Sequence, residues 1–232
     1  MILTSKDIAR MIDLSCVRTT SNQTDIDKMV RAAQIYGFGQ VSVLQSFIPY
    51  TKSLIENMPE IRLVGNVSFP SGSDSTPIKV LQAQEMAAAG CDEIDMVLNV
   101  GKLRSGAIEE VTADVNAVVK AAAPIPVKVI IEIMALTENE ARQACQITLQ
   151  SGAAFVKTGT GWMARGTTVE DIRLIHSIVG DRIKIKASGG IRSLETLLQM
   201  LREGATRFGI NLQSGTQIIE QVRENGDRVK LD

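Results

Sequence analysis

Short apolar runs alternate along the whole chain with longer segments in which apolar residues recur at helical spacing. The short runs are rich in Val, Ile and Leu, which is typical of strands buried in a parallel sheet. Alternation of such strands with helices predicts repeated βαβ units. The eight predicted strands cover residues 11–16, 40–44, 62–69, 93–100, 127–133, 155–159, 183–188 and 207–211.

Signals for helix ends lie between these strands. Residues that favour the first position of a helix are Thr24, Ser75 (followed by Pro77), Thr137 (with Glu140), Thr168 (with Asp171) and Ser193. Glycines that favour the position after a helix are Gly37, Gly90, Gly152, Gly180 and Gly204. Eight strands are enough to close a barrel. The sequence therefore predicts an α/β fold, a single (β/α)8 TIM barrel spanning residues 1–232. An open doubly wound sheet would need a G-x-G-x-x-G turn after the first strand, and none is present there.

Two lysines stand in strand-like runs that open into glycines. Lys157 lies in FVKTGTG (155–161) and Lys186 in IKIKASGGIR (183–192). Burial of an ammonium lowers its pKa, and a second cation nearby acts in the same direction. A neutral lysine can attack a carbonyl carbon and form a Schiff base. The alternative is that each side chain extends from its strand end into water.

Charged residues also occur inside other predicted strands. Alternation with a period of two places Asp95, Lys128, Glu132, Lys157 and Lys186 on the faces that would point into a barrel. We expect these groups to converge at the carboxyl ends of the strands, where barrels bind their ligands. Asp95 would then stay ionised and could relay protons through water. A purely structural network of ion pairs is the alternative.

Composition and charge exclude several classes of function. A net charge of −1 and an aromatic content of 3% argue against a nucleic-acid surface. No basic leader and no apolar run of membrane-spanning length is present, so we expect a cytoplasmic protein without a membrane partner. Cys16, Cys91 and Cys145 are expected to be reduced thiols in the core. The single histidine, His176, is expected on a helix surface, and no cluster of metal ligands occurs, which predicts catalysis without a metal.

Several of these runs together resemble the deoxyribose-phosphate aldolases, a family of class I aldolases. The matching runs are GCDEIDMVLNVGKLRSG (90–106), PVKVIIE (126–132), GAAFVKTGTG (152–161), TTVEDIRL (167–174), VGDRIKIKASGGIR (179–192) and GATRFGI (204–210). The resemblance implies that Lys157 is the Schiff-base nucleophile, that Lys186 lowers its pKa, and that Asp95 belongs to a proton relay. It also implies that Lys128 binds substrate hydroxyls and that Asp13 supports the lysines. Family members cleave 2-deoxyribose 5-phosphate to glyceraldehyde 3-phosphate and acetaldehyde, use no cofactor and often form homo-oligomers.

The chain departs from the family pattern where the tail of the substrate would bind. The phosphate turn after the eighth strand is replaced by the longer segment 209–215, Trp162, Met163 and Arg165 follow Lys157, and Ser42 stands where relatives have cysteine. Three interpretations stay open. The first is an aldolase for a phosphorylated sugar, whose anion binds the backbone of Gly189 and Gly190. The second is a Schiff-base aldolase for an unphosphorylated or carboxylate-bearing aldehyde. The third is a barrel that binds a phosphorylated ligand without a Schiff base, as a sensor or an isomerase.

Arg165 is the candidate for recognition of that anion. It follows the strand of Lys157 by a short loop, and a guanidinium can bind a phosphate or a carboxylate through two hydrogen bonds. The alternative is an exposed arginine of the loop.

Overall fold

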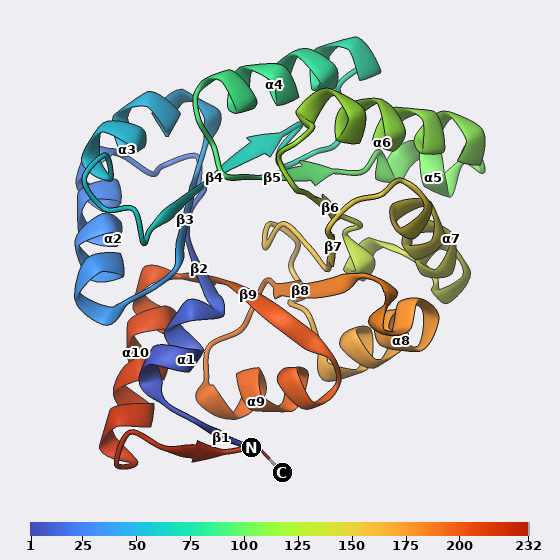
Figure 1. Cartoon of the computed structure of the whole chain (residues 1–232). Coiled ribbons are helices and arrows are strands. Elements are labelled where there is room, and N and C mark those ends of the chain that lie inside the picture. The colour runs from blue at the N-terminus through green and yellow to red at the C-terminus, as the bar shows by residue number, and fades with distance from the viewer. Residues whose placement is uncertain (232) are drawn as a thin grey trace.

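The computed structural model describes residues 1–231 as a closed barrel of eight parallel strands surrounded by helices (Figure 1). Each strand pairs with its neighbours in chain order, and the last strand pairs with the first to close the ring. This arrangement confirms the predicted (β/α)8 barrel. The barrel strands are β2 (Ile12–Cys16), β3 (Gln40–Val43), β4 (Arg62–Val67), β5 (Glu93–Val97), β6 (Val127–Ile130), β7 (Phe155–Lys157), β8 (Lys184–Ser188) and β9 (Ala205–Asn211).

Helices occupy the connections between the strands. They are α1 (Ser5–Arg10), α2 (Gln23–Tyr36), α3 (Ile48–Leu54), α4 (Thr76–Ala88), α5 (Val100–Arg104), α6 (Ile108–Ala122), α7 (Glu138–Gln150), α8 (Val169–Val179), α9 (Leu194–Arg202) and α10 (Leu212–Glu224). Three 3₁₀ turns, η1 (Gln45–Phe47), η2 (Ile133–Ala135) and η3 (Gly180–Arg182), complete the connections. None of the helices within residues 1–231 has the length and apolar character needed to cross a membrane.

Most of the predicted helix ends agree with the structure. Thr137 and Thr168 form capping boxes at the starts of α7 and α8, and the hydroxyl of Ser193 caps α9. The predicted start at Thr24 is wrong, because the side chain of Asn22 accepts the hydrogen bond from the backbone N–H of Asp25 and caps α2 two residues earlier. The five glycines expected after helices all adopt positive φ.

Five predicted strands, β3 to β7, were too long at their carboxyl ends, and the excess is largest, three residues, at β5 and β6. β5 ends at Val97 and β6 at Ile130, although apolar residues continue beyond both. After β6 the chain turns into η2 through Glu132, whose φ of 52° is outside the strand region. This turn carries the side chain of Glu132 away from the inward face of β6.

A small antiparallel ladder at the chain ends was not predicted. β1 (Ile2–Leu3) pairs with β10 (Val229–Lys230) and lies outside the barrel (Figure 1). A strand of two residues is too short to show any alternation in its sequence. The ladder places the two ends of the described chain side by side beside α1.

The barrel separates an apolar layer from a charged interior. Outward residues of β5 and β6, including Ile94, Met96 and Val129, are fully buried in the apolar core between strands and helices. Buried residues that alternate with them, such as Asp95 and Lys128, point inward. The fold therefore brings charged side chains of several strands into one enclosed space.

Candidate active site

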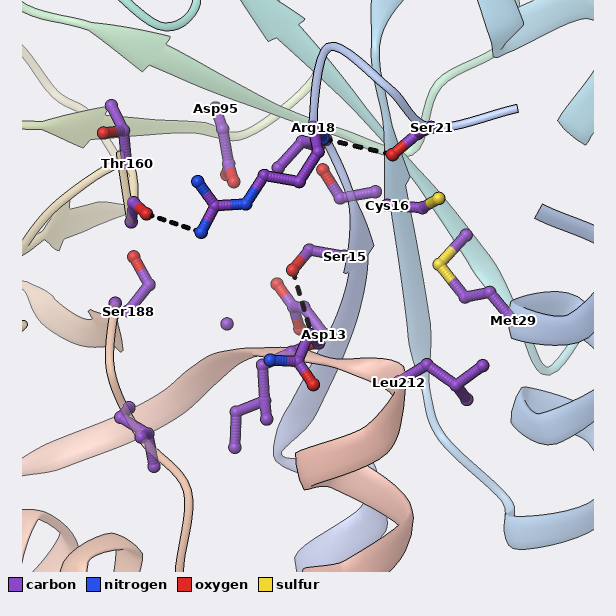
Figure 2. Close-up of a pocket in the computed structure, with 18 of the residues that line it drawn as sticks. Asp13, Ser15, Cys16, Arg18, Ser21, Met29, Asp95, Thr160, Ser188 and Leu212 are labelled. Carbon is purple, nitrogen blue, oxygen red and sulfur yellow. Dashed lines mark hydrogen bonds between the residues drawn. The ribbon is translucent and has the colours of Figure 1, made fainter. Parts of the chain in front are cut away.

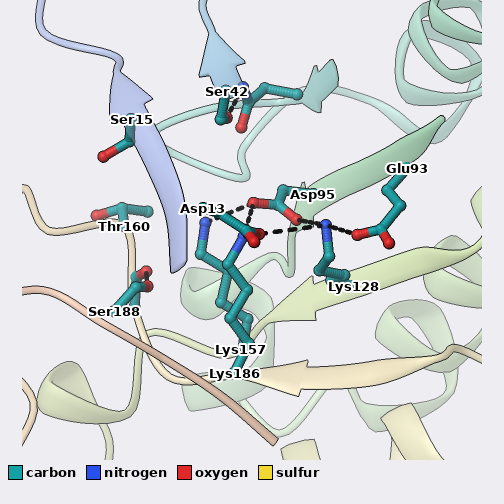
Figure 3. Close-up of polar contacts among 12 residues, drawn as sticks. Asp13, Ser15, Ser42, Glu93, Asp95, Lys128, Lys157, Thr160, Lys186 and Ser188 are labelled. Atoms are coloured by element: carbon teal, nitrogen blue, oxygen red, sulfur yellow. Dashed lines mark hydrogen bonds and ion pairs between the residues drawn. The ribbon is translucent and has the colours of Figure 1, made fainter. Parts of the chain in front are cut away.

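Seven charged side chains from six strands fill the interior of the barrel, and Figure 3 shows those that surround Asp95. They are Asp13 of β2, Glu93 and Asp95 of β5, Lys128 of β6, Lys157 of β7, Lys186 of β8 and Arg207 of β9. Such groups are almost never buried without a partner. Their contacts with one another decide which of them keep their charge.

Asp95 is the centre of this network. Its Oδ2 accepts hydrogen bonds from the Nζ atoms of Lys157 at 2.7 Å and Lys186 at 2.9 Å, and its Oδ1 lies 3.0 Å from Nζ of Lys128. Burial raises the pKa of the carboxyl, but the three lysines outweigh it and hold the pKa well below its usual value. Asp95 is therefore a carboxylate at neutral pH.

The other two carboxylates bind the remaining cations. Asp13 Oδ2 lies 2.6 Å from Nζ of Lys186, and Asp13 Oδ1 accepts a hydrogen bond from Arg207 at 3.0 Å. Glu93 Oε2 lies 2.5 Å from Nζ of Lys128. Lys128, Lys186 and Arg207 thus each have a carboxylate that they do not share with Lys157.

The charges of this network do not balance unless one cation is neutral. Four cationic side chains face three carboxylates, and within residues 1–231 Lys157 is the cation of the four whose only ion pair is with Asp95. Burial is the main cause that lowers the pKa of Lys157, to about 8, and Lys186 and Lys128 act in the same direction against Asp95. Burial also opposes the charge of Lys186, but Asp13 and Asp95 outweigh it and raise its pKa. Lys157 is therefore the amine that gives up its proton.

A cavity of about 370 Å³ opens above Lys157, at the carboxyl ends of the strands. Asp13, Asp95, Lys157 and Lys186 form its floor. Its upper wall is formed by residues of the loops after β2, β7 and β8 and of the start of α10, including Arg18, Gly161, Gly189, Gly190, Arg192 and Leu212. Figure 2 shows Arg18 and Leu212 of this wall. The volume suits a small organic ligand. Such a ligand would contact Nζ of Lys157, the amine whose pKa is lowered.

The two glycines of this wall can present backbone N–H groups to an anion. Gly189 and Gly190 have φ values of 98° and 79°, which non-glycine residues rarely adopt. Within residues 1–231 neither N–H has an acceptor, whereas the carbonyl of Gly189 accepts from the N–H of Thr167 at 2.9 Å. A Cβ at the facing Gly166 would come within 3.0 Å of Gly189 O and of the Cα of Gly190, so the two loops pack closely.

The structure brings together Asp13, Asp95, Lys157 and Lys186, as the alternation and the resemblance predicted. Lys128 differs from the expectation, because it is fully buried behind Asp95 and Glu93 and is not among the residues that line the cavity. It is therefore placed to fix Asp95 rather than to bind substrate hydroxyls. Glu132 also lies apart: its carboxylate accepts hydrogen bonds from the N–H and hydroxyl of Thr160, at 3.1 and 2.6 Å.

Arg165 is not placed where an anion in the cavity would bind. Its guanidinium pairs with Asp171 at 2.6 Å on the surface, and Arg165 does not line the cavity. Arg18 takes that place instead, since it extends across the cavity toward the loop after β7 (Figure 2). Its Nη2 donates to the carbonyl of Gly161 at 2.9 Å, and the guanidinium lies 5.7 Å from the centre of the Trp162 ring.

Three charged residues of the site were not identified from the sequence. Glu93 lies two positions before Asp95 and Arg207 two before Gly209, so the alternation that found Asp95 was also a signal for them. Arg18 stands in a loop, where no periodicity applies. Signals of this kind are absent from loops because tertiary contacts set the direction of their side chains.

The remaining candidate chemistries lie outside the cluster. His176 is on α8 with a side chain 40% exposed, as predicted. Cys91 and Cys145 are buried free thiols, whereas Cys16 is partly exposed and lines the cavity, so the expectation of a core position is wrong for Cys16. Nowhere in residues 1–231 do three or more His, Cys, Asp or Glu side chains form a group that could hold a metal ion.

Comparisons with known proteins agree with this geometry. The model of a family described as DeoC/LacD family aldolase matches residues 11–217. A deoxyribose-phosphate aldolase of Sinorhizobium medicae is 43% identical over 94% of this chain and 88% of the relative. One of Carboxydothermus hydrogenoformans is 40% identical over 97% of this chain and 100% of the relative. The solved deoxyribose phosphate aldolase of Aeropyrum pernix, which is tetrameric, superposes with a TM-score of 0.87 at 26% identity, over 96% of this chain and 93% of that chain.

Proposed function

Because the chain belongs to the DeoC/LacD family of aldolases, we propose that it cleaves 2-deoxyribose 5-phosphate reversibly to glyceraldehyde 3-phosphate and acetaldehyde, through a Schiff base on Lys157. The observation that carries this proposal is the lowered pKa of Lys157 in its buried ion-pair network. Among the described residues of the interior, Lys157 is the cation that pairs with Asp95 alone, its pKa is lowered to about 8, and it lies at the floor of the cavity. A site that only bound an anion would need a charged lysine there.

The first half of the reaction uses the amine. The neutral Nζ of Lys157 adds to the aldehyde carbon C1 of the open-chain sugar, and loss of water gives the iminium ion. Lys186 stays charged and lies against the same oxygen of Asp95 as Lys157, at 2.9 and 2.7 Å. Its charge disfavours a second proton on Lys157, which keeps the amine reactive.

The second half of the reaction breaks the C2–C3 bond. A base removes the proton of the C3 hydroxyl, the bond electrons move toward the iminium nitrogen to form an enamine, and C3 leaves as the aldehyde of glyceraldehyde 3-phosphate. Protonation of the enamine at C2 and hydrolysis of the iminium release acetaldehyde. Asp95 is the ionised carboxylate beside Nζ, so we assign it to the relay of these protons through water.

We place the phosphate at the upper wall of the cavity. The free N–H groups of Gly189 and Gly190 and the side chains of Arg18 and Arg192 line this region. The segment 209–215 supports the same placement, because it runs from the end of β9 into the first turn of α10, and Leu212 lies at the amino end of that helix. Helix amino ends bind anions.

A retro-aldol assay tests this function. The purified protein is given 2-deoxyribose 5-phosphate and, in parallel, 2-deoxyribose, and the aldehydes released are measured. We expect the phosphorylated sugar to have a kcat/KM at least about tenfold higher, because a charged hydrogen-bonding pair contributes about 1.5 to 3 kcal/mol. Equal kcat/KM values would replace this proposal with an aldolase for unphosphorylated substrates.

Self-association and location of the chain are two further properties for which we make proposals. We propose that the chain self-associates, because the similar aldolase of Aeropyrum pernix is tetrameric. We also propose a cytoplasmic location, in keeping with the three free cysteines. Sedimentation of the purified protein tests the first of these.

A further inference from the structure

A buried amide lies in the wall of the cavity beside the lysine cluster. Asn66 of β4 is 1% exposed, and its Nδ2 donates to the carbonyl of Val43 at 2.8 Å and to the hydroxyl oxygen of Ser42 at 3.2 Å. A carbonyl can only accept, so Val43 fixes which end of the amide faces it. The orientation of the Asn66 side chain is therefore determined by the backbone of β3.

The other end of this amide has no partner. Asn66 Oδ1 is buried and receives no hydrogen bond from residues 1–231. Buried polar atoms are almost always hydrogen-bonded, so an unpaired one in a cavity wall points to a bound group. Gln40 Oε1 is likewise unpaired, but Gln40 does not line the cavity, whereas Asn66 does.

Ser42 supplies the complementary group. Its oxygen accepts from Asn66, and its own O–H donates to no acceptor within the described chain. Ser42 also lines the cavity, and its hydrogen bond is drawn in Figure 3. A free donor beside a free acceptor matches a hydroxyl group, which both donates and accepts.

The position of this pair relates it to the reacting carbons. Asn66 is in register with Asp95 on the neighbouring strand, so both side chains point inward at the same level. Asp95 Oδ2 holds the Nζ of Lys157 at 2.7 Å. The pair therefore lines the same cavity as Lys157, one strand from Asp95, on a side toward which the carbon after the iminium carbon would extend.

We propose that Ser42 and Asn66 form a subsite for a hydroxyl on the second carbon of the donor aldehyde, so that the enzyme also uses 2-hydroxyaldehydes as donors. This inference rests on the Schiff base proposed for Lys157. Glycolaldehyde would condense with Lys157 and lose water, and loss of a proton from its C2 would give a hydroxylated enamine. That carbon attacks the aldehyde of glyceraldehyde 3-phosphate, and hydrolysis of the iminium then releases an aldopentose 5-phosphate.

The test compares two donors with one acceptor. Glyceraldehyde 3-phosphate is supplied with acetaldehyde or with glycolaldehyde, and kcat/KM is measured for each donor in the wild type, Ser42→Ala and Asn66→Leu. We expect product from both donors in the wild type. In each variant we expect the glycolaldehyde-to-acetaldehyde ratio to fall about tenfold, the effect of one or two neutral hydrogen bonds.

Ser15→Ala is the matched control. Ser15 also lines the cavity and is in register with Ser42, but its hydroxyl already donates to the carbonyl of Ile210 at 3.3 Å. We expect the donor ratio of this variant to stay within about twofold of the wild type. An equal fall in Ser15→Ala would show that loss of any serine hydroxyl changes the ratio, and would overturn the subsite.

Other outcomes separate this inference from the proposed function. Turnover of acetaldehyde without turnover of glycolaldehyde would overturn the inference and leave the aldolase intact. Use of glycolaldehyde with an unchanged ratio in Ser42→Ala would assign the hydroxyl to other groups. Absence of product with both donors would contradict the proposed function, and the inference with it. Ser42→Ala keeps the test valid if Asn66→Leu fails to fold.

Discussion

Replacement of Lys186 by methionine should raise the pKa of Lys157, so that a larger fraction of this amine is protonated at neutral pH. Without Lys186, three cations face three carboxylates, and the network is neutral only when Lys157 is charged. The Nζ atoms of Lys157 and Lys186 contact the same oxygen of Asp95, at 2.7 and 2.9 Å. They are thus roughly 5 Å apart, and two charges at that distance repel by about 3 kcal/mol at an effective dielectric constant of about 20.

This repulsion corresponds to about two units of pKa. In the wild type, with a Lys157 pKa of about 8, about one tenth of the amine is neutral at pH 7. In Lys186→Met that fraction should fall about 100-fold at pH 7, and should recover as pH rises toward about 10. The assay is the rate of iminium formation with acetaldehyde, trapped by borohydride, as a function of pH.

Lys79→Met is the control for loss of a buried lysine. Lys79 is also fully buried, but it pairs with Asp114 at 2.6 Å between α4 and α6, away from the cavity. We expect this variant to lose stability while the pH profile of trapping keeps its midpoint. Lys186 does not set the pKa of Lys157 if Lys186→Met traps acetaldehyde with the midpoint of the wild type, or if Lys79→Met shifts the midpoint as much.

Three further predictions test other parts of the site. Asp95→Asn removes a carboxylate and leaves Lys157 neutral, so trapping should persist while turnover falls by roughly 10² or more; loss of trapping would contradict the assigned relay. Arg18→Ala should raise the KM for 2-deoxyribose 5-phosphate about tenfold and leave 2-deoxyribose nearly unchanged, whereas Arg165→Ala, whose guanidinium pairs with Asp171, should change neither. The pKa of Lys157 is about 8 in the folded protein and near 10.5 in the unfolded chain. The charge of Lys157 therefore destabilises the fold fully below pH 8, and this penalty disappears as the pH rises to 10.5. Lys157→Met should therefore raise the free energy of unfolding at pH 7 by up to about 3 kcal/mol. Denaturant unfolding at pH 10 should show little of this stabilisation.

The sequence predicted the barrel because each level of local structure agreed with it. The short apolar runs located all eight barrel strands, and capping residues such as Thr137 and Thr168 located helix starts. Strand ends were less predictable, since the apolar run at 127–133 continues past the point where β6 leaves the sheet. The prediction that Glu132 lies on the inward face of this strand was wrong for that reason. The turn there depends on tertiary contacts, including those of its carboxylate with Thr160.

Alternation identified which charges point inward but could not give their depth or their partners. Lys128 and Lys157 both face the interior, yet Lys128 lies behind Asp95 and only Lys157 reaches the cavity. In the loops, even the direction of a side chain was not predictable. Arg165 is captured by Asp171 of α8, while Arg18 is held over the cavity by the carbonyl of Gly161, and neither contact has a periodic signal in the sequence.

Lys157 is the amine that we propose forms the Schiff base. The most direct test is reduction with borohydride in the presence of acetaldehyde, followed by digestion and mass spectrometry of the peptides. We expect a reduced two-carbon fragment to be attached to Lys157 alone. Attachment to Lys186 with Lys157 unmodified, or no attachment to either lysine, would contradict this assignment.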